Sequence, residues 1–93
     1  MTSAALLAAL KVDLGIMTTA YDDRLAHYLT AAQIEIEREG AALDLTDFDH
    51  CQIVIMYAAW TWRKRDTGEG MPRMLRYALN NLVLSQKMAE GSD

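Results

Sequence analysis

The chain has 93 residues, of which 52% are apolar and 24% charged, the composition of one small globular domain. Thirteen acidic against nine basic residues give a net charge of −4, which disfavours a generally basic nucleic-acid-binding domain. Because there is only one cysteine, an internal disulfide and a cysteine zinc cluster are excluded. A chain this short is only marginally stable alone, so we expect it to associate with further copies or with a partner.

The composition favours helices throughout. Alanine and leucine supply 26 residues, valine and isoleucine only 8, and there is one proline. This bias is typical of helices, because β-branched side chains crowd the preceding helical turn, whereas Ala and Leu lose little freedom there. No segment combines alternating polarity with a tight hairpin turn. The sequence therefore predicts a single all-α domain over residues 1–93, a small bundle of about four helices at roughly 3–13, 19–39, 46–65 and 72–89.

The first predicted helix begins at Ser3, whose hydroxyl can accept a hydrogen bond from an unpaired backbone N–H of the first turn. Its leucines form one stripe, and Gly15 then permits the left-handed conformation that ends a helix. The apolar segment 4–10 has no preceding basic residue and no cleavage pattern, so we do not interpret it as a signal peptide.

The second predicted helix starts near Thr19, which forms an approximate capping box with Asp22. Apolar side chains from Tyr21 to Ile36 then recur at steps of three and four residues. This spacing predicts a long amphipathic helix that closes at Gly40.

The third predicted helix opens at Thr46 or Asp47 and is apolar on nearly every face over residues 53–60. A helix of this kind has to be surrounded by other helices or by a neighbouring subunit. The apolar run is far shorter than the ~20 residues of a membrane-spanning helix, so we predict no membrane segment. The basic residues 63–65 follow at the negative end of the helix dipole, where cations are favoured.

The fourth predicted helix starts at Met71-Pro72, because proline suits the first helical position. Apolar side chains continue at alternating steps of three and four residues, and we expect them to form one core stripe. The residues of this stripe are Met71, Met74, Leu75, Ala78, Leu79 and Leu82.

No motif in the sequence supports catalysis, and we predict a protein that is not an enzyme and has no cofactor. His50 and Cys51 are adjacent, so on a helix they point about 100° apart and cannot readily hold one metal ion together. His27 lies on another predicted helix, and three ligands from two helices make a weak metal site. We interpret them as a buried thiol and two surface or interface histidines; an enzyme that uses all three would require a bound metal.

The charges are unevenly distributed along the chain. Residues 1–62 carry nine acidic and three basic groups, whereas residues 63–93 carry six basic and four acidic groups. A basic patch at one end of an acidic body could contact the acidic side of an adjacent copy, head to tail, and close into a ring. Helix-end complementarity explains the same pattern equally well, and contact with nucleic-acid phosphates is a third interpretation.

Two parts of the sequence resemble a known family. The stretch IVIMYAAWTWRKRDTGEGMPRMLRYALNN, residues 53–81, resembles the C-terminal half of the head–tail connector proteins of tailed phages. LKVDLGI at 10–16, TAYDDRL at 19–25 and IEREG at 36–40 are similar to the N-terminal half of the same family. The order and spacing of these segments carry the resemblance, which covers roughly residues 5–87.

The resemblance implies a structural virion protein, encoded by a phage or prophage, at the head–tail junction. Connectors of this family are small helical adaptors that form a ring, here expected to contain about twelve copies, coaxial with the portal protein. Genomic DNA passes through the channel of the ring without sequence-specific contact, and a tail-completion or stopper protein attaches beneath it. Before assembly such a protein resides in the cytoplasm of the bacterial host.

We predict which side chains make these contacts. Carboxylates such as Asp22, Asp23, Glu35 or Glu39 are expected to face the channel or the outer surface, because an acidic wall repels DNA phosphates. Of the two tryptophans on different helix faces, we expect Trp62 to be interfacial and Trp60 to lie in the core. The residues predicted to contact a neighbouring copy or the portal are Trp62, Arg63, Lys64, Arg65, Met71, Arg73, Arg76, Leu82, Val83, Leu84 and Lys87.

The alternative is a small, dimeric, helical DNA-binding or regulatory module. The second and third predicted helices could be mistaken for a helix-turn-helix motif. The long connection at residues 40–46 and the acidic start of the third helix make poor DNA-reading elements, however. Salt-dependent DNA binding would favour this alternative, and a ring would favour the connector.

Overall fold

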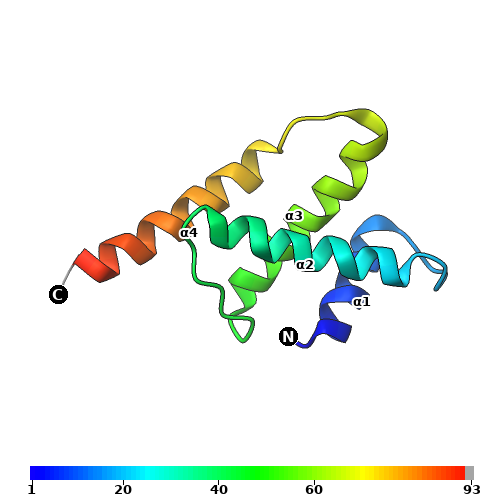
Figure 1. Ribbon diagram of the computed structural model, residues 1–93, viewed down its shortest axis with the longest axis horizontal. Helices are drawn as coiled ribbons and strands as arrows, with labels where there is room; N and C mark the ends of the chain where they lie inside the picture. Colours follow the sequence, from blue (N-terminus) through cyan, green and yellow to red (C-terminus); the bar gives the residue numbers. More distant parts are fainter. Residues whose placement is uncertain (92–93) are drawn as a thin grey trace.

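Four helices make up all the regular secondary structure of the computed structural model, which describes residues 1–91 (Figure 1). They are α1 (Ser3–Leu14), α2 (Asp22–Arg38), α3 (Phe48–Thr67) and α4 (Arg73–Gly91). The predicted all-α bundle is confirmed, and the described residues contain no strand.

The N-cap of helix α1 lies one residue before the predicted cap, Ser3. The hydroxyl of Thr2 accepts a hydrogen bond from the Ala5 N–H at 3.1 Å, so Thr2 is the N-cap and Ser3 is already helical. Gly15 ends the helix with φ +70°, and its N–H and that of the next residue bond to carbonyls of the last turn. The predicted glycine C-cap is therefore confirmed, and the N-cap prediction was wrong by one residue.

Helix α2 begins at Asp22, three residues after the predicted start. Its N-cap residue, Tyr21, makes no side-chain capping bond, so the predicted capping box at Thr19 is wrong. Asp22 instead contacts Lys11 of α1, with the ammonium nitrogen 2.8 Å from a carboxylate oxygen. The carboxylate that was expected to cap its own helix thus joins α2 to α1.

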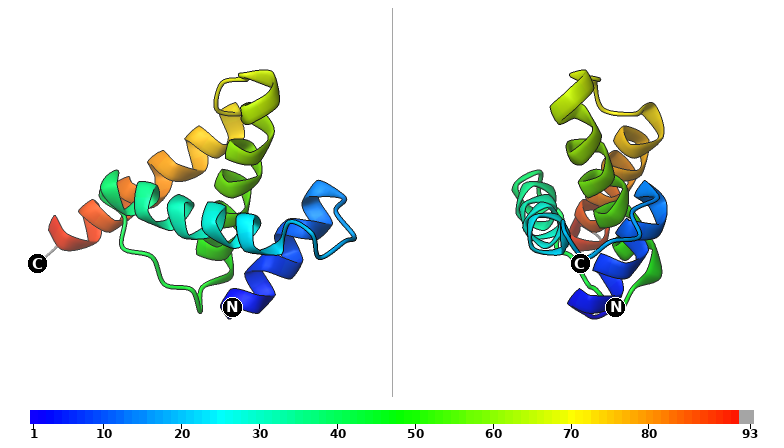
Figure 2. Two further views of the ribbon diagram at one scale, coloured as in Figure 1. Left: turned by 45° about the vertical axis from the view of Figure 1, so that its right-hand side comes forward. Right: turned by 90° about the vertical axis from the view of Figure 1, so that its right-hand side faces the viewer.

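Helix α3 is the centre of the bundle and contacts the other three helices. In Figure 2, α1 and α2 lie on different sides of it. The prediction that an all-round apolar helix must be surrounded is confirmed within one copy, because every residue from Ile53 to Ala59 except the half-buried Met56 is buried. Asp47 caps its N-terminus by accepting hydrogen bonds from the N–H groups of Asp49 and His50.

Helix α4 leaves the top of α3 and diverges from it, which contributes to the elongated shape of 48 × 29 × 17 Å (Figures 1 and 2). Leu75 and Leu79 are fully buried on its inner face. Further along, the Gln86 amide exchanges two hydrogen bonds, of 2.8 and 2.9 Å, with the backbone of Ala42. The first half and the middle of α4 are therefore held by packing, and the following turn by the Gln86 amide, while the end of the helix extends beyond the other helices (Figure 1).

The connection between α2 and α3 is held by its own polar groups. Both the hydroxyl and the N–H of Thr46 donate to one carboxylate oxygen of Asp44, at 2.6 and 2.9 Å. The Asp44 N–H donates to Nδ1 of His50 at 2.9 Å. These bonds fix the connection that brings the chain back to the start of α3.

Replacing Thr46 with valine is expected to raise the pKa of Asp44. The hydrogen bonds from the hydroxyl and the N–H of Thr46 lower the pKa of this carboxyl below its ordinary value of 3.8, and the His50 and N-terminal charges act in the same direction. Because the folded pKa is the lower one, the stabilisation is fully present above about pH 4 and is lost as the pH falls through the folded pKa. An NMR titration of the Asp44 carboxyl measures the shift, and Thr46→Ser is the control that keeps the hydroxyl. An unchanged midpoint in Thr46→Val would contradict the assignment.

Candidate interaction surface

The basic residues at the C-terminus of α3 lie against the chain itself rather than forming one open patch. The Arg65 guanidinium stacks 3.6 Å from the Trp62 ring centroid and donates to the Trp62 carbonyl at 2.8 Å. The Lys64 ammonium lies 4.2 Å from the Trp60 ring centroid. Arg63 reaches the end of α1 and donates to the Asp13 carbonyl. These contacts favour the helix-end interpretation of residues 63–65, although all three side chains keep solvent exposure.

The two arginines of α4 have different roles. Arg76 forms an ion pair of 2.7 Å with Glu39, just past the end of α2. Arg73 is exposed and takes part in no ion pair within residues 1–91. Of these two predicted interface residues, only Arg73 therefore offers an uncommitted charge.

Trp62 is more deeply buried than Trp60, the reverse of what we expected from the sequence. Trp62 is 8% exposed and contacts the rings of Tyr21 and Tyr28 edge-on, at centroid distances of 5.7 and 5.3 Å. Trp60 is half-buried, and its indole N–H donates to the Glu69 carbonyl at 3.2 Å. The prediction that Trp62 is the interfacial tryptophan was wrong, because α2 covers that face of α3.

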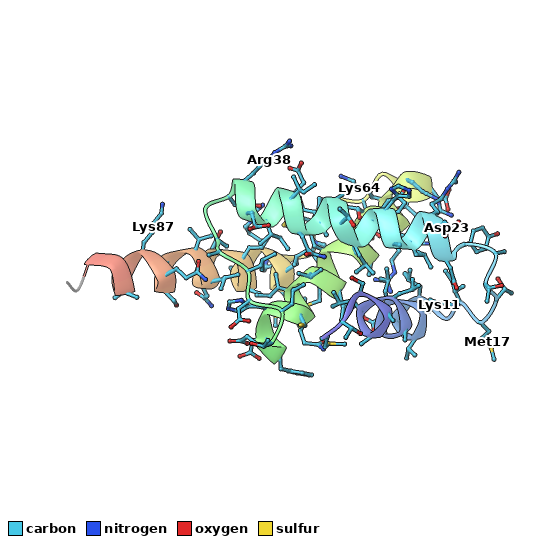
Figure 3. All side chains as sticks on the ribbon, turned by 60° about the horizontal axis from the view of Figure 1, so that its bottom comes forward. Lys11, Met17, Asp23, Arg38, Lys64 and Lys87 are labelled. Carbon is cyan, nitrogen blue, oxygen red and sulfur yellow. The ribbon has the colours of Figure 1, made fainter. Side chains whose placement is uncertain are left out.

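The remaining predicted contact residues divide into two groups. Met71, Leu82 and Val83 are half-buried and pack against the core. Leu84 and Lys87 are exposed, and Lys87 projects away from α4 (Figure 3). Only the second group is fully available to a partner.

An exposed apolar stripe on α4 was missed by the sequence analysis. Met74, Tyr77, Leu84 and Met88 are between 55% and 71% exposed. The spacing of three, seven and four residues puts them on one helix face, opposite the buried Leu75. The expectation that Met74 belongs to the core stripe was wrong. The available signal was that apolar residues occupy both faces of α4, which one core cannot bury.

Most of the carboxylates predicted to face the channel or the outer surface form ion pairs within the chain. Asp22 pairs with Lys11, Glu35 with Arg38, and Glu39 with Arg76. Asp23 and Glu37 lie on the outward face of α2, are exposed, and have no ion pair in the described part of the chain. These two carboxylates are the free acidic groups of α2.

Two shallow recesses flank α2. One, between α1 and α2, is lined by Ser3, Leu6, Ala26, Leu29, Thr30 and Gln33. The other, between α2 and α3, includes Tyr28, Ala31, Glu35 and Tyr57. Burial raises the pKa of the Tyr57 phenol, and the Glu35 and Glu39 carboxylates add to this effect while Arg76 opposes it. Both recesses include small side chains in their lining, such as Ala26 in the first and Ala31 in the second, which leave room for another helix to approach.

The histidines and the cysteine do not converge. Cys51 is buried and its thiol donates to the Leu45 carbonyl, whereas His50 accepts from the Asp44 N–H and His27 is exposed on α2. Among the side chains that the structure describes, no group of three His, Cys, Asp or Glu is placed to hold a metal ion. The candidate functional surfaces are therefore the exposed faces of α2 and α4 described above.

Comparisons of the chain with protein-family models, curated proteins and solved structures find no match. None of the helices in the described region is both long and apolar enough to cross a bilayer. The resemblance to head–tail connectors stays a prediction, to be judged by the surfaces above and by experiment.

Proposed function

We propose that the protein is a head–tail connector of a tailed phage or prophage. In this role about twelve copies form a ring below the portal protein, a tail-completion or stopper protein attaches beneath, and DNA passes through the channel. The mature protein resides in the virion, and the free protein in the cytoplasm of the bacterial host.

The observation that carries this proposal is the apolar outward face of α4. A single copy leaves Met74, Tyr77, Leu84 and Met88 uncovered although its core is closed around α3. Exposed apolar side chains gathered on one helix face mark an interaction site; here they form two pairs, with the exposed Asn81 between them. This face belongs to α4, whose first half lies within the segment 53–81 that resembles the connector family. The acidic excess of residues 1–62 also suits a wall that does not grip DNA.

The proposal is tested by imaging the assembly and measuring its mass. The purified protein is examined by negative-stain electron microscopy and native mass spectrometry, alone and after mixing with the portal protein encoded by the same phage genome. We expect ring-shaped particles with a central channel, coaxial with the portal ring. Portal protein alone is the control. A protein that stays monomeric and leaves the portal unchanged would contradict the proposal.

The same experiment addresses the dimeric regulator. A particle of two copies that binds duplex DNA, with an affinity that falls steeply with salt, would replace the connector by this alternative. The uncovered face of α4 would then be the dimer interface.

A further inference from the structure

The outward face of α4 has a defined length and a charged edge. Its apolar stripe runs from Met74 to Met88, fourteen residues, which is about 21 Å of helix at a rise of about 1.5 Å per residue. Arg73 and Lys87 are also fourteen residues apart and lie along one edge of the stripe, with Asn80 midway between them. Both cations are exposed, and neither has an ion pair in the described residues.

The outward face of α2 carries the opposite charges at the same spacing. Asp23 and Glu37 are fourteen residues apart, with Thr30 midway, and all three are exposed. They lie opposite the buried side of α2, which includes Leu25 and Ile36. Both helices therefore present two unpaired charges about 21 Å apart with a polar residue between them.

We call the row formed by Asp23, Thr30 and Glu37 the acidic line of α2. The surface beside this line can accept apolar side chains. Ala26 and Thr30 line two adjoining recesses, one of which continues to Leu6 and Leu29 between α1 and α2. The recess between α1 and α2 has a volume of about 200 Å³, and small side chains form much of its wall. If the apolar stripe of α4 from another copy lay along this recess, the edge of α4 that carries Arg73 and Lys87 would lie next to the acidic line.

Two copies of the α4 stripe are a poorer match for each other. In an antiparallel, two-fold symmetric pair the same edges of the two helices adjoin, so Arg73 of one copy would meet Lys87 of the other. Like charges placed together oppose association. The face that complements α4 is thus the acidic one on α2.

We propose that the outward face of α4 in one copy packs on the outward face of α2 in a second copy, with Arg73 and Lys87 paired to Asp23 and Glu37. This inference rests on the proposed function and names the subunit contact within the ring. The contact joins two different surfaces, so each copy can bind one neighbour through α4 and another through α2. Repetition of such a contact gives a closed ring or a helical filament, as its rotation dictates.

Reversal of the charges on one face at a time tests the pairing. Variant one is Arg73→Glu with Lys87→Glu, and variant two is Asp23→Lys with Glu37→Lys. Each variant alone has like charges on both faces and is expected to self-associate on the order of 100-fold more weakly than the natural chain. A mixture of the two variants restores opposite charges at every contact, so it is expected to assemble with strictly alternating copies. Native mass spectrometry and sedimentation equilibrium at low salt measure both effects.

The control is Asp66→Lys with Glu69→Lys, which changes the net charge as much as variant two but lies in the last turn of α3 and in the connection that follows it. It is expected to assemble like the natural chain. Circular dichroism confirms that every variant is folded.

Four outcomes would overturn the proposed contact: a natural chain that stays monomeric into the millimolar range, either variant assembling normally alone, a mixture that stays dissociated, or a control that loses assembly. Rings that persist on the portal in both variants would refute this contact and leave the connector function standing. Mixed variants that assemble as predicted but only into filaments without affinity for the portal would refute the function and leave the contact standing.

Discussion

Replacing Trp62 with alanine is expected to cost about 3–5 kcal/mol of the free energy of unfolding. The ring is 8% exposed, is flanked by Tyr21 and Tyr28, and has the Arg65 guanidinium over one face. The alanine leaves a cavity between α2 and α3 that the two tyrosines only partly fill. Small domains have total stabilities near the lower end of about 5–15 kcal/mol, so the variant loses most of its folded population on mild heating. Urea unfolding followed by circular dichroism measures the loss.

Trp60→Ala is the matched control for this prediction. Trp60 lies two residues earlier on the same helix, but it is half-buried and contacts the exposed Lys64 and the Glu69 carbonyl. Its replacement removes one hydrogen bond, one cation–π contact, the edge-on contact with the Tyr57 ring and partial packing against the core, so we expect a loss of about 2–3 kcal/mol, less than for Trp62. Equal losses for the two variants would show that Trp62 is not part of the core.

Replacing Leu79 with alanine is expected to cost about 2–5 kcal/mol and to loosen α4 first. Leu79 and Leu75 are fully buried and are the main apolar anchors of α4. Apart from these two leucines, α4 is held by the ion pair of Arg76 with Glu39, by the half-buried Leu82 and Val83, and by the Gln86 amide on Ala42. Amide hydrogen exchange measures the effect residue by residue, and we expect faster exchange in α4 than in α3.

Leu84→Ala is the control, because it removes the same side chain from the opposite face of the same helix. Leu84 is 57% exposed. We expect its replacement to change the stability of the single chain by less than about 0.5 kcal/mol and to weaken assembly instead. If Leu84→Ala unfolded the chain as strongly as Leu79→Ala, the division of α4 into an inner and an outer face would be wrong.

These variants separate the two tasks of the apolar residues. Trp62 and Leu79 complete the core of one copy, whereas Leu84 and its neighbours on the stripe lie outside it. The core of a single copy is more complete than the short chain suggested, because α3 is enclosed by α1, α2 and α4 without help from a second copy. The surfaces left for the proposed contact with a second copy are therefore the outer faces of the helices.

Several local features were predictable because they depend only on neighbours along the chain. The left-handed conformation at Gly15 and the capping by Asp47 require a particular residue type at a helix end, so composition and spacing predict them. The same holds for the number of helices and for the central place of α3, since a helix that is apolar all round must be enclosed. The resemblance to connector proteins added an expected function, which no local pattern contains and which stays a prediction.

The tertiary structure alone decided which side of each helix is buried and which charges meet. The spacing of apolar residues gave α4 two apolar faces. The direction in which α4 packs against α3 decides that Leu75 and Leu79 are buried in the core and that Met74 is exposed. In the same way, Trp62 is buried because α2 crosses that face of α3, and Asp22 meets Lys11 because α1 and α2 lie side by side. Sequence by itself determined the helices because hydrogen bonds and rotamer freedom within a helix are local. Burial and ion pairing depend on residues distant in the sequence, so only the packed arrangement fixes them.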